Sequence, residues 1–336
     1  MNKLNLGIMT YNGGATIHAA IDIIAEQISQ QNLDVKLLIS DNASIDDTFD
    51  ICKNYSQKYP FIKIHRNEKN IGYDANICTL VNMADSEYLW LFSDDDVMTD
   101  PYAIKTVLDY LNKHNVEFLF LNHNNSIILD EKMPDYFHNG NEFFMNTRFK
   151  SGLVTSCIIK VDTWKDLNME RFINSAWIHF AYQVYALAPN RGKNCSAGII
   201  KEVLIAPIPS DKVRVNADKN KNHSWGQGGT SLLIGLQLEE VIFSHLKELG
   251  YSDNVKELSL RVIYGYGLYF SKSIIYAKVA GLKIDKDLYL RLKKVWGHYP
   301  SFKYINKFLC LCPSLILKAM CMPWRIIRKI KAVMIS

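Results

Sequence analysis

Residues 87–96 read EYLWLFSDDD, an apolar run that ends in three consecutive aspartates, and this stretch decides the fold. A short run of aromatic and aliphatic residues predicts a strand buried in the middle of a sheet. Ligands of parallel sheets bind outside the carboxyl ends of the strands, which is where Asp94, Asp95 and Asp96 would lie. Adjacent carboxylates repel one another, so a hard divalent cation bound through oxygen is expected beside them. The alternative is a solvated acidic turn before a helix that begins near Pro101.

Residues 4–92 alternate between patterns typical of strands and patterns typical of helices. Strand patterns cover residues 4–9, 35–39, 61–64 and 88–92, and helical patterns cover 17–28, 46–55 and 75–83. This alternation predicts an α/β fold of the Rossmann-like kind, in which helices cover both faces of a mostly parallel sheet.

A polar segment follows each of the four strand patterns. These segments are residues 10–12, 41–44, 67–74 and 93–96. Because the carboxyl ends of parallel strands meet at one edge of a sheet, we expect the four segments to form a single site there.

The same segments resemble a known family. TYN at 10–12, SDNAS and DDT within 40–48, NIGYDAN at 70–76 and SDDD at 93–96 are similar in order and spacing to the nucleotide-sugar domain of family-2 glycosyltransferases. The resemblance covers residues 4–125 well and continues loosely to about residue 225. It implies the GT-A fold. Within the family the chain most resembles bacterial transferases that build O-antigen or capsule repeats, including the abequosyltransferase-like group.

The resemblance implies a nucleotide-sugar donor and assigns a role to each motif. Thr10 and Tyr11, with Asn12, would line the base and ribose, and Asp41 would hydrogen-bond the base, expected to be uracil or another pyrimidine. The donor set is completed by the following residues: Asn70 and Gly72, where the backbone approaches the nucleotide; Asp74 and Asn76 close by; and Asp94 and Asp95.

Asp94 and Asp96 would form the DxD pair that holds Mn²⁺ or Mg²⁺. Asp96 would contact the metal, and Asp94 would lie nearer the ribose or a metal-bound water. A divalent cation that bridges diphosphate oxygens neutralises the charge of the leaving group, and the protein then needs only oxygen ligands and correct positioning. Asp95, between the two, is expected to point its side chain away from them.

Several of these residues also have a purely structural interpretation. Asn42 and Ser44 are residue types that favour turns and helix caps. Gly72 would serve equally in a turn that needs a positive φ, and Tyr11 would serve as a packing residue.

The catalytic base is less clear from the sequence. Family-2 enzymes invert the anomeric centre, so one side chain takes a proton from the acceptor hydroxyl. The family usually supplies an Asp at the start of a helix, but residues 174–187 (NSAWIHFAYQVYAL) contain no carboxylate. His179 lies where the Asp is expected and is the first candidate, because imidazole titrates near neutrality. Asp162 is the second candidate and Glu170 a further one. A histidine packed in the core is the alternative, and Trp177 is expected to stack on an acceptor sugar.

Residues 207–229 read PIPSDKVRVNADKNKNHSWGQGG, a polar segment that we predict to be an active-site lid. Its cations Arg214, Lys219 and Lys221 would close on the diphosphate. His223 would be a further metal ligand, and Trp225 would face the acceptor. A solvated surface loop is the alternative.

The remainder of the chain divides by composition. We predict a glycosyltransferase domain at 1–228 (nucleotide half 1–125, acceptor half 126–228), a helical extension at 229–300 and a tail at 301–336. The tail holds seven Lys or Arg and no Asp or Glu, whereas the whole chain has a formal charge of +5. Its apolar residues are too few and too interrupted to span a bilayer. A basic amphipathic segment of this kind is typical of binding to an anionic membrane surface. Packing on its own domain or on a partner chain is the alternative, and no module for nucleic acid accompanies it.

The composition favours a cytoplasmic protein. The N-terminus leads directly into the first strand pattern without the features of a signal peptide, and the seven scattered cysteines favour reduced thiols. We therefore expect an inverting, metal-dependent glycosyltransferase, peripheral on the inner face of a bacterial plasma membrane. It would act on a lipid-linked oligosaccharide during O-antigen or capsule synthesis.

Two other functions remain open at this stage. A phosphatase of the haloacid dehalogenase type is suggested by DDDVMT at 94–99, and a non-catalytic scaffold that binds nucleotide-sugars is suggested by the missing carboxylate near His179. A dinucleotide oxidoreductase is disfavoured because no G-x-G-x-x-G follows the first strand pattern.

Overall fold

A computed structural model of the chain describes residues 2–123, 132–209, 230–265, 274–275, 277–279, 281–297, 305, 307–314 and 316–317. The chain forms two compact units. The first contains residues 1–221 and 245–259, and the second contains residues 222–244 and 260–336.

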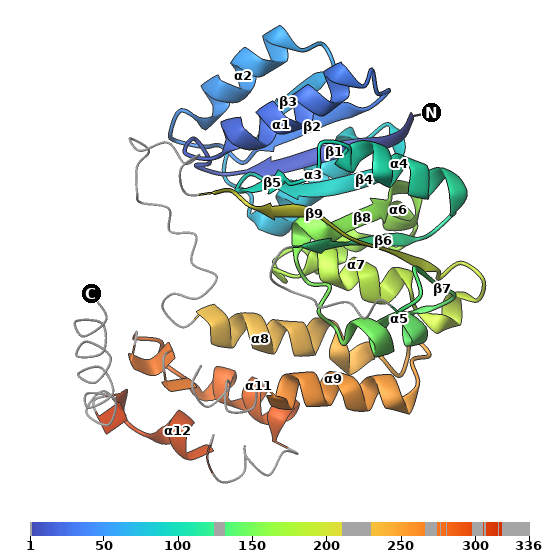
Figure 1. The fold of residues 1–336 in the computed structure, drawn as a ribbon. Helices are drawn as coiled ribbons and strands as arrows, with labels where there is room; N and C mark the ends of the chain where they lie inside the picture. Colours follow the sequence, from blue (N-terminus) through green and yellow to red (C-terminus); the bar gives the residue numbers. More distant parts are fainter. Residues whose placement is uncertain are drawn as a thin grey trace, which may run out of the picture. The chain divides into compact units, whose positions relative to one another are not determined.

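The first unit is built on one sheet whose described strands lie in the order β3-β2-β1-β4-β8-β6-β9-β5, with β7 paired to β9 (Figure 1). The bounds of the strands are β1 Asn2–Thr10, β2 Lys36–Asp41, β3 Ile62–Arg66, β4 Ser86–Ser93, β5 Asp96–Met98, β6 Phe118–His123, β7 Tyr136–Phe137, β8 Cys157–Lys160 and β9 Ala197–Pro207.

Most strands of this sheet run in one direction. β1 pairs in parallel with β2 and β4, β2 pairs in parallel with β3, and β6 pairs in parallel with β9. β8 lies antiparallel between β4 and β6, so β6 and β9 point the same way as β4. The sequence prediction of an α/β fold with a mostly parallel sheet is confirmed. The carboxyl ends of β1, β2, β3, β4 and β6 therefore lie at one edge.

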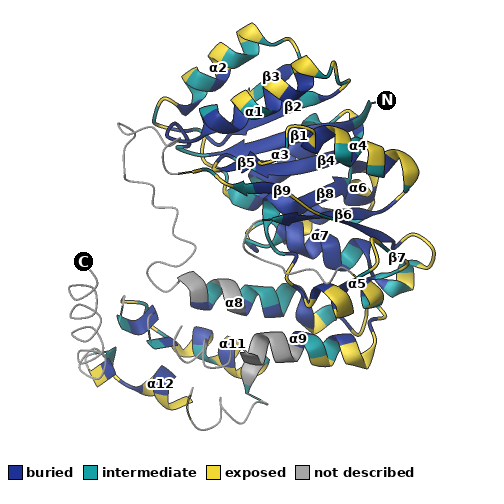
Figure 2. Cartoon of the chain, in the orientation of Figure 1, coloured by how far each residue is buried: buried dark blue, intermediate teal, exposed yellow. Residues whose placement is uncertain are grey.

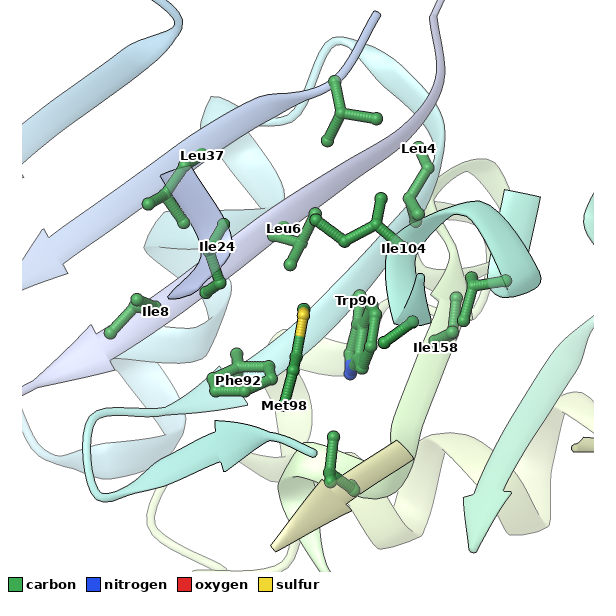
Figure 3. Close-up of a cluster of buried hydrophobic side chains, with 14 of the residues drawn as sticks. Leu4, Leu6, Ile8, Ile24, Leu37, Trp90, Phe92, Met98, Ile104 and Ile158 are labelled. Atoms are coloured by element: carbon green, nitrogen blue, oxygen red, sulfur yellow. The ribbon is translucent and has the colours of Figure 1, made fainter. Parts of the chain in front are cut away.

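Helices cover both faces of this sheet. On one face, Leu6 and Ile8 of β1 pack in a core cluster with Ile24 of α1 and Ile104 of α4 (Figure 3). Gly7 points to the opposite face, where Leu80 of α3 packs on it. Burying a single large aliphatic side chain contributes roughly 1.5–3 kcal/mol, so the burial of many such side chains in this cluster stabilises the sheet and its helices. The helices of the first unit are α1 Ile17–Gln30, α2 Thr48–Lys58, α3 Tyr73–Met83, α4 Ala103–Lys113, α5 Gly140–Thr147, α6 Val161–Asp166 and α7 Ile178–Ala186, with short 3₁₀ helices at Val154–Ser156, Met169–Phe172 and Pro189–Arg191.

The described part of the second unit is helical, as predicted for the C-terminal region. It contains α8 (Thr230–Val241), α11 (Lys286–Trp296) and α12 (Lys307–Leu311), and α9 (Asp253–Gly265) begins in the first unit and ends in the second. A small core joins Leu232 and Leu236 of α8 to Leu292 of α11. Within the described residues, no helix combines the length and the apolar character that crossing a membrane requires. Figure 2 shows the contrast in burial between the central strands and the exposed sides of the helices.

Three elements differ from the sequence prediction. The helix expected at 46–55 begins at Thr48, because Asp46 uses its side chain to accept from the Thr48 backbone N–H. The short strand β5, which begins at the third aspartate, was not expected, since only its pairing with β9 makes it a strand. Within the helical extension expected at 229–300, α8 ends at Val241 and is followed by a 3₁₀ turn, Phe243–His245, a break that was not predicted.

Candidate functional site

The turn after β1 is pressed against acidic side chains from two other segments. A Cβ added to Gly13 would lie 2.1 Å from Oδ2 of Asp94, and one added to Gly14 would lie 2.1 Å from Oδ1 of Asp47. Asn12, in the same turn, has a left-handed backbone (φ 53°), and its N–H donates to Ser44 Oγ at 2.8 Å. Glycine is therefore required at positions 13 and 14 by this close approach. No sequence pattern marked the acidic neighbours of these two glycines.

Asp94 lies at the carboxyl end of β4 and is bound to the end of β1. The hydroxyl of Thr10 donates to its Oδ2 at 2.5 Å, and both residues are buried. The parallel register of β1 and β4, which pairs Met9 with Ser93, brings these two residues together. The structure thus unites the first and fourth predicted segments.

Asp96 is held from the acceptor half of the chain. The hydroxyl of Thr155 donates to its carboxylate and accepts the backbone N–H of Ser93 at 3.0 Å. Burial raises the pKa of Asp96 to about 6, against the lowering effect of the Thr155 bond, and the neighbouring carboxylates of Asp95 and Asp94 raise it further. Thr155 was missed by sequence analysis, because a single threonine far along the chain has no pattern that marks it.

Asp95 differs from its two neighbours in exposure. Its side chain is exposed and accepts from the hydroxyl of Ser93, while its backbone carbonyl accepts the N–H of Ile208 at 2.9 Å. The two buried aspartates and the exposed one therefore follow the alternation expected for the DxD stretch.

Asp41, at the end of β2, is almost completely buried, with 1% of its side chain exposed. Its carboxylate accepts from the hydroxyl and N–H of Ser44 and pairs with Nε of Arg66 at 3.3 Å. Burial raises its pKa, against the lowering effects of Ser44 and Arg66. Ser44 thus forms hydrogen bonds with both the Asp41 carboxylate and the Asn12 backbone, so it connects two of the predicted segments in addition to forming a turn.

A network of amides connects the end of β2 to the loop before α3. Asn42 accepts from the Ile71 N–H at 2.9 Å, and its amide N–H donates to Oδ1 of Asn70 at 2.9 Å and to the carbonyl of Gly72 at 3.4 Å. Gly72 has a φ of 86°, and an added Cβ would meet nothing within 4 Å, so its backbone conformation is the reason for glycine. The loop that carries Asn70 and Gly72 therefore lies beside the Asp41 segment.

Asp74 and Asn76, placed in the donor set by sequence, direct their side chains elsewhere. The Asn76 amide oxygen accepts from Ser40 Oγ at 2.7 Å and from Asn67 at 3.0 Å beneath the loop. Both oxygens of Asp74 accept backbone N–H groups of residues 176–178. These acceptor atoms therefore shape the surrounding loops, and the donor-binding role of Asp74 and Asn76 stays a prediction.

The acidic residues at this edge are close enough to influence one another. The thiol of Cys52 lies beneath them, and burial together with the charges of Asp41, Asp94 and Asp46 raises its pKa to about 12. In the part of the chain that the structure describes, no group of three or more His, Cys, Asp or Glu side chains could hold a metal ion. Two buried carboxylates with like charge nevertheless fit Mg²⁺ or Mn²⁺, which commonly use one or two carboxylates and complete their shell with phosphate oxygens and water.

His179 is buried at the start of α7, with both ring nitrogens in contact with a partner. Its Nε2 lies 2.9 Å from the carbonyl of Gly152 and its Nδ1 lies 3.3 Å from the hydroxyl of Tyr73. Because a carbonyl only accepts, Nε2 carries the proton and Nδ1 presents a lone pair to Tyr73. Burial lowers the pKa of His179 to about 4. The ring of Trp177 stacks beside it with centroids 6.2 Å apart, so the predicted acceptor pair is brought together.

The second base candidate lies away from the aspartates. Asp162 is exposed in α6, two residues after Lys160, and the antiparallel register pairs Lys160 with Tyr88. Asp162 therefore lies near the amino end of β4, whereas Asp94 and Asp96 follow its carboxyl end. The predicted lid residues Arg214, Lys219, Lys221, His223 and Trp225 lie outside the described residues.

Comparison with known families identifies part of the chain. Residues 6–157 match the sequence profile described as Glycosyl transferase family 2. This stretch is a family-2 glycosyltransferase domain. Abequosyltransferase RfbV of Salmonella typhimurium is 37% identical to this chain over 105 residues, which is 30% of this chain and 31% of RfbV. The chain thus spans about a third of the length of the curated relatives that it matches.

Two solved glycosyltransferase structures share the fold over nearly the whole chain. TarS 1–349 of S. aureus in complex with UDP has a TM-score of 0.52 and 15% identity, covering 90% of this chain and 91% of TarS 1–349. The mannosyltransferase PcManGT of Pyrobaculum calidifontis, in complex with GDP-Man and Mn²⁺, has a TM-score of 0.54 and 13% identity, covering 96% and 87%. At this identity the likeness concerns the fold alone, and it confirms the predicted GT-A glycosyltransferase fold.

Proposed function

We propose that this protein transfers a sugar from a nucleotide-sugar to a lipid-linked oligosaccharide, with inversion and with the help of a divalent metal ion. One observation carries the proposal: Thr10 and Asp41 end β1 and β2, Asp94 and Asp96 follow β4, and all four are buried groups at the carboxyl edge of the sheet. Ligands of open α/β sheets bind at this edge.

The donor would lie across the turn after β1. Tyr11 and Asn12 would border the base and ribose, with Asp41 bonded to the base. The absence of side chains at Gly13 and Gly14 lets the acidic groups reach the backbone here, and Gly72 would give the same close approach on the other side. Asn70 would contact the donor from the loop fixed by Asn42.

Asp94 and Asp96 would hold Mn²⁺ or Mg²⁺, which when bound neutralises the diphosphate leaving group. Thr10 and Thr155 keep the two carboxylates in place, so little reorganisation is needed on binding. PcManGT, which shares the fold, was solved with GDP-Man and Mn²⁺. Mechanistically, the chain's own task is to orient the donor and to exclude water from its anomeric carbon.

Direct displacement requires a base for the acceptor hydroxyl. His179 is the candidate that the geometry keeps, because its proton is fixed on Nε2 by the Gly152 carbonyl and its Nδ1 therefore presents an unprotonated lone pair. The acceptor hydroxyl would take the position of the Tyr73 hydroxyl at Nδ1. Trp177 would stack on the acceptor sugar, as aromatic rings beside sugar sites do.

Membrane-surface binding through residues 301–336 would bring the protein to a lipid-linked acceptor. In the described part of this tail, Ile305, Phe308 and Leu311 recur at every third position and are 54%, 58% and 65% exposed. An apolar stripe beside cations favours the interface of an anionic membrane. The similarity to RfbV, an abequosyltransferase, favours O-antigen or capsule synthesis at the cytoplasmic face.

The donor site is tested by thermal shift with UDP-, GDP-, CDP- and dTDP-sugars, with and without Mn²⁺. A shift that needs both the metal and one nucleotide is expected, because a ligand that binds only the native state raises apparent stability. If the nucleotide-sugars raise the melting temperature equally with and without Mn²⁺, the metal ion has no place in the proposal. The absence of any shift would overturn the donor site and favour the phosphatase or another class.

The tail is tested by sedimentation with phosphatidylglycerol vesicles. Serine at Ile305, Phe308 and Leu311 together should release the protein, whereas Leu290→Ser, at an exposed leucine of α11, should not. Equal binding of both variants would contradict the interfacial tail.

A further inference from the structure

We propose that Asp74 is a positioning residue for the acceptor: it holds the loop at residues 174–178 and so sets the place of Trp177 and His179. The inference rests on the proposed function for the meaning of "acceptor", and it assigns to a residue of the NIGYDAN motif a task outside the donor site.

The contacts of Asp74 all reach one loop, about a hundred residues further along the chain. Its Oδ2 accepts the N–H of Ala176 at 2.7 Å and the hydroxyl of Ser175 at 3.4 Å, and its Oδ1 accepts the N–H of Ile178 at 3.3 Å. The side chain is 3% exposed. A buried carboxylate that accepts this many bonds is fully engaged, because each ionised oxygen gains from charge-assisted donors.

The loop needs such a partner because of its position and its backbone. Ile178 is the first residue of α7, and the residue before it is Trp177, whose side chain has no oxygen to cap the first turn. Asp74 therefore supplies the cap from another helix. Its charge also lies at the positive end of the α7 dipole, where a carboxylate is favourable.

Two residues of the loop have left-handed backbones, Asn174 with a φ of 73° and Ala176 with a φ of 61°. For alanine this conformation is sterically unfavourable, so the loop keeps it only where its surroundings impose it. The bond from the Ala176 N–H to Asp74 is the shortest that the carboxylate makes, and it lies at the strained residue itself. Strain of this kind is concentrated at functional sites in proteins.

The hydrogen bonds of Asp74 to residues 175–178 fix the positions of two residues that would face the acceptor, the stacking candidate Trp177 and the candidate base His179. Trp177 and His179 lie on either side of Ile178, whose N–H Asp74 binds. Tyr73, the neighbour of Asp74 in the chain, contacts His179 directly, with ring centroids 5.8 Å apart. The first turn of α3 thus controls both the backbone and the histidine of the acceptor loop.

The same turn begins in the donor loop. Gly72 is the residue before α3, and its carbonyl accepts from Asn42. Only one residue, Tyr73, therefore lies between Gly72 of the donor loop and Asp74, which holds the acceptor loop. This short connection makes the acceptor loop depend on a segment that the nucleotide would touch.

The test uses hydrogen exchange of the peptides at 174–180 in the full-length protein without ligand, for wild type, Asp74→Ala, Asp74→Asn and Asp50→Ala. Asp50 is an exposed aspartate in the first turn of α2 and is the matched control. Loss of a hydrogen bond to a charged group corresponds to at least about a tenfold change in local opening. Asp74→Ala should accelerate exchange there by that factor or more, without changing the peptides of β4. Asp74→Asn keeps one acceptor oxygen and should lie between Asp74→Ala and wild type.

A second readout separates positioning from donor binding. The shift that Mn²⁺ and the selected nucleoside diphosphate produce should be equal in wild type and in Asp74→Asn. Unchanged exchange at 174–180 with a lost nucleotide shift would overturn the inference and return Asp74 to the donor site. Exchange raised across the whole sheet would reduce Asp74 to a general stabilising role and would also overturn it. If no nucleotide shifts even the wild type, the proposed function fails, and the exchange data still decide whether Asp74 holds the loop.

Discussion

The two halves of the first unit organise their polar groups in different ways. In the half formed by β1–β4, Asp41 and Asp94 lie at strand ends and bond to residues beside them, and parallel register alone brings them together. In the half that contains α7, Trp177 and His179 follow a loop with left-handed residues, held by Asp74 from another helix. The strand ends that carry Asp41 and Asp94 are placed by the pairing of the sheet, whereas a loop held by long-range side-chain contacts can be altered without changing the sheet.

The largest effect is expected at the donor edge. Asp96→Ala should reduce turnover of the selected nucleotide-sugar by roughly a thousandfold, because charge neutralisation by a metal is worth several kcal/mol. The fold should survive, since the side chain removed is held by one hydroxyl, that of Thr155. Asp95→Ala, at the exposed neighbour, is the control and should retain activity. Both are measured by donor turnover with Mn²⁺. Normal turnover in Asp96→Ala would mean that the donor edge does not hold a metal.

A second test concerns pH and the acceptor loop. Burial lowers the pKa of His179 from 6.5 to about 4, so the folded protein keeps this imidazole neutral where the unfolded chain takes up a proton. Stability from this residue is therefore lost as the pH falls from about 6.5 to about 4, by an amount on the order of 3 kcal/mol. His179→Gln should lose less stability than wild type over this range in urea unfolding. Parallel pH curves for the two proteins would show that the imidazole is not kept neutral by burial.

How much could be predicted from sequence follows the same division. The strands of the nucleotide half, and the gathering of Asp41, Asp94 and Asp96 at one edge, are local patterns followed by polar residues, and sequence analysis found them. Thr155 could not be found, because its hydroxyl acquires a role only when β8 pairs with β4. The direction of Asp74 was likewise hidden, since its partners are backbone N–H groups that no residue type marks.

Asp162 illustrates the same limit for the base. It was a candidate only as a carboxylate in the second half of the domain, and the antiparallel direction of β8 sends it to the opposite end of β4 from the aspartates. Strand direction is a tertiary property, and nothing in residues 157–162 distinguishes the two directions.

An intermediate effect is expected when a methyl group is added to a glycine, and the same substitution in each half allows a direct comparison of their nucleotide affinities. Gly13→Ala would place a Cβ 2.1 Å from Oδ2 of Asp94 and 2.5 Å from Oγ1 of Thr10, so this pair must separate. Overpacking of this kind costs roughly 1–3 kcal/mol, and we expect nucleotide affinity to fall about tenfold or more. Gly152→Ala meets only ordinary contacts, the nearest being the Trp177 ring at 3.8 Å, and should bind nucleotide as wild type does. Isothermal titration with Mn²⁺ present measures both; equal affinities would mean that the turn after β1 is not part of the donor site.

The smallest effect is the sharpest test of how the acceptor loop is held. Glycine adopts the left-handed backbone of Ala176 (φ 61°) without steric cost, although it loses more entropy on folding. Ala176→Gly should therefore raise the unfolding free energy by about 0.5 kcal/mol, measured by urea denaturation. In an Asp74→Ala background the loop is free to leave the left-handed conformation, and the gain should vanish. Residues that share a contact show such non-additivity, whereas independent sites do not. Equal gains in both backgrounds would mean that Ala176 keeps its conformation without Asp74, and that the acceptor loop is as self-contained as the donor edge.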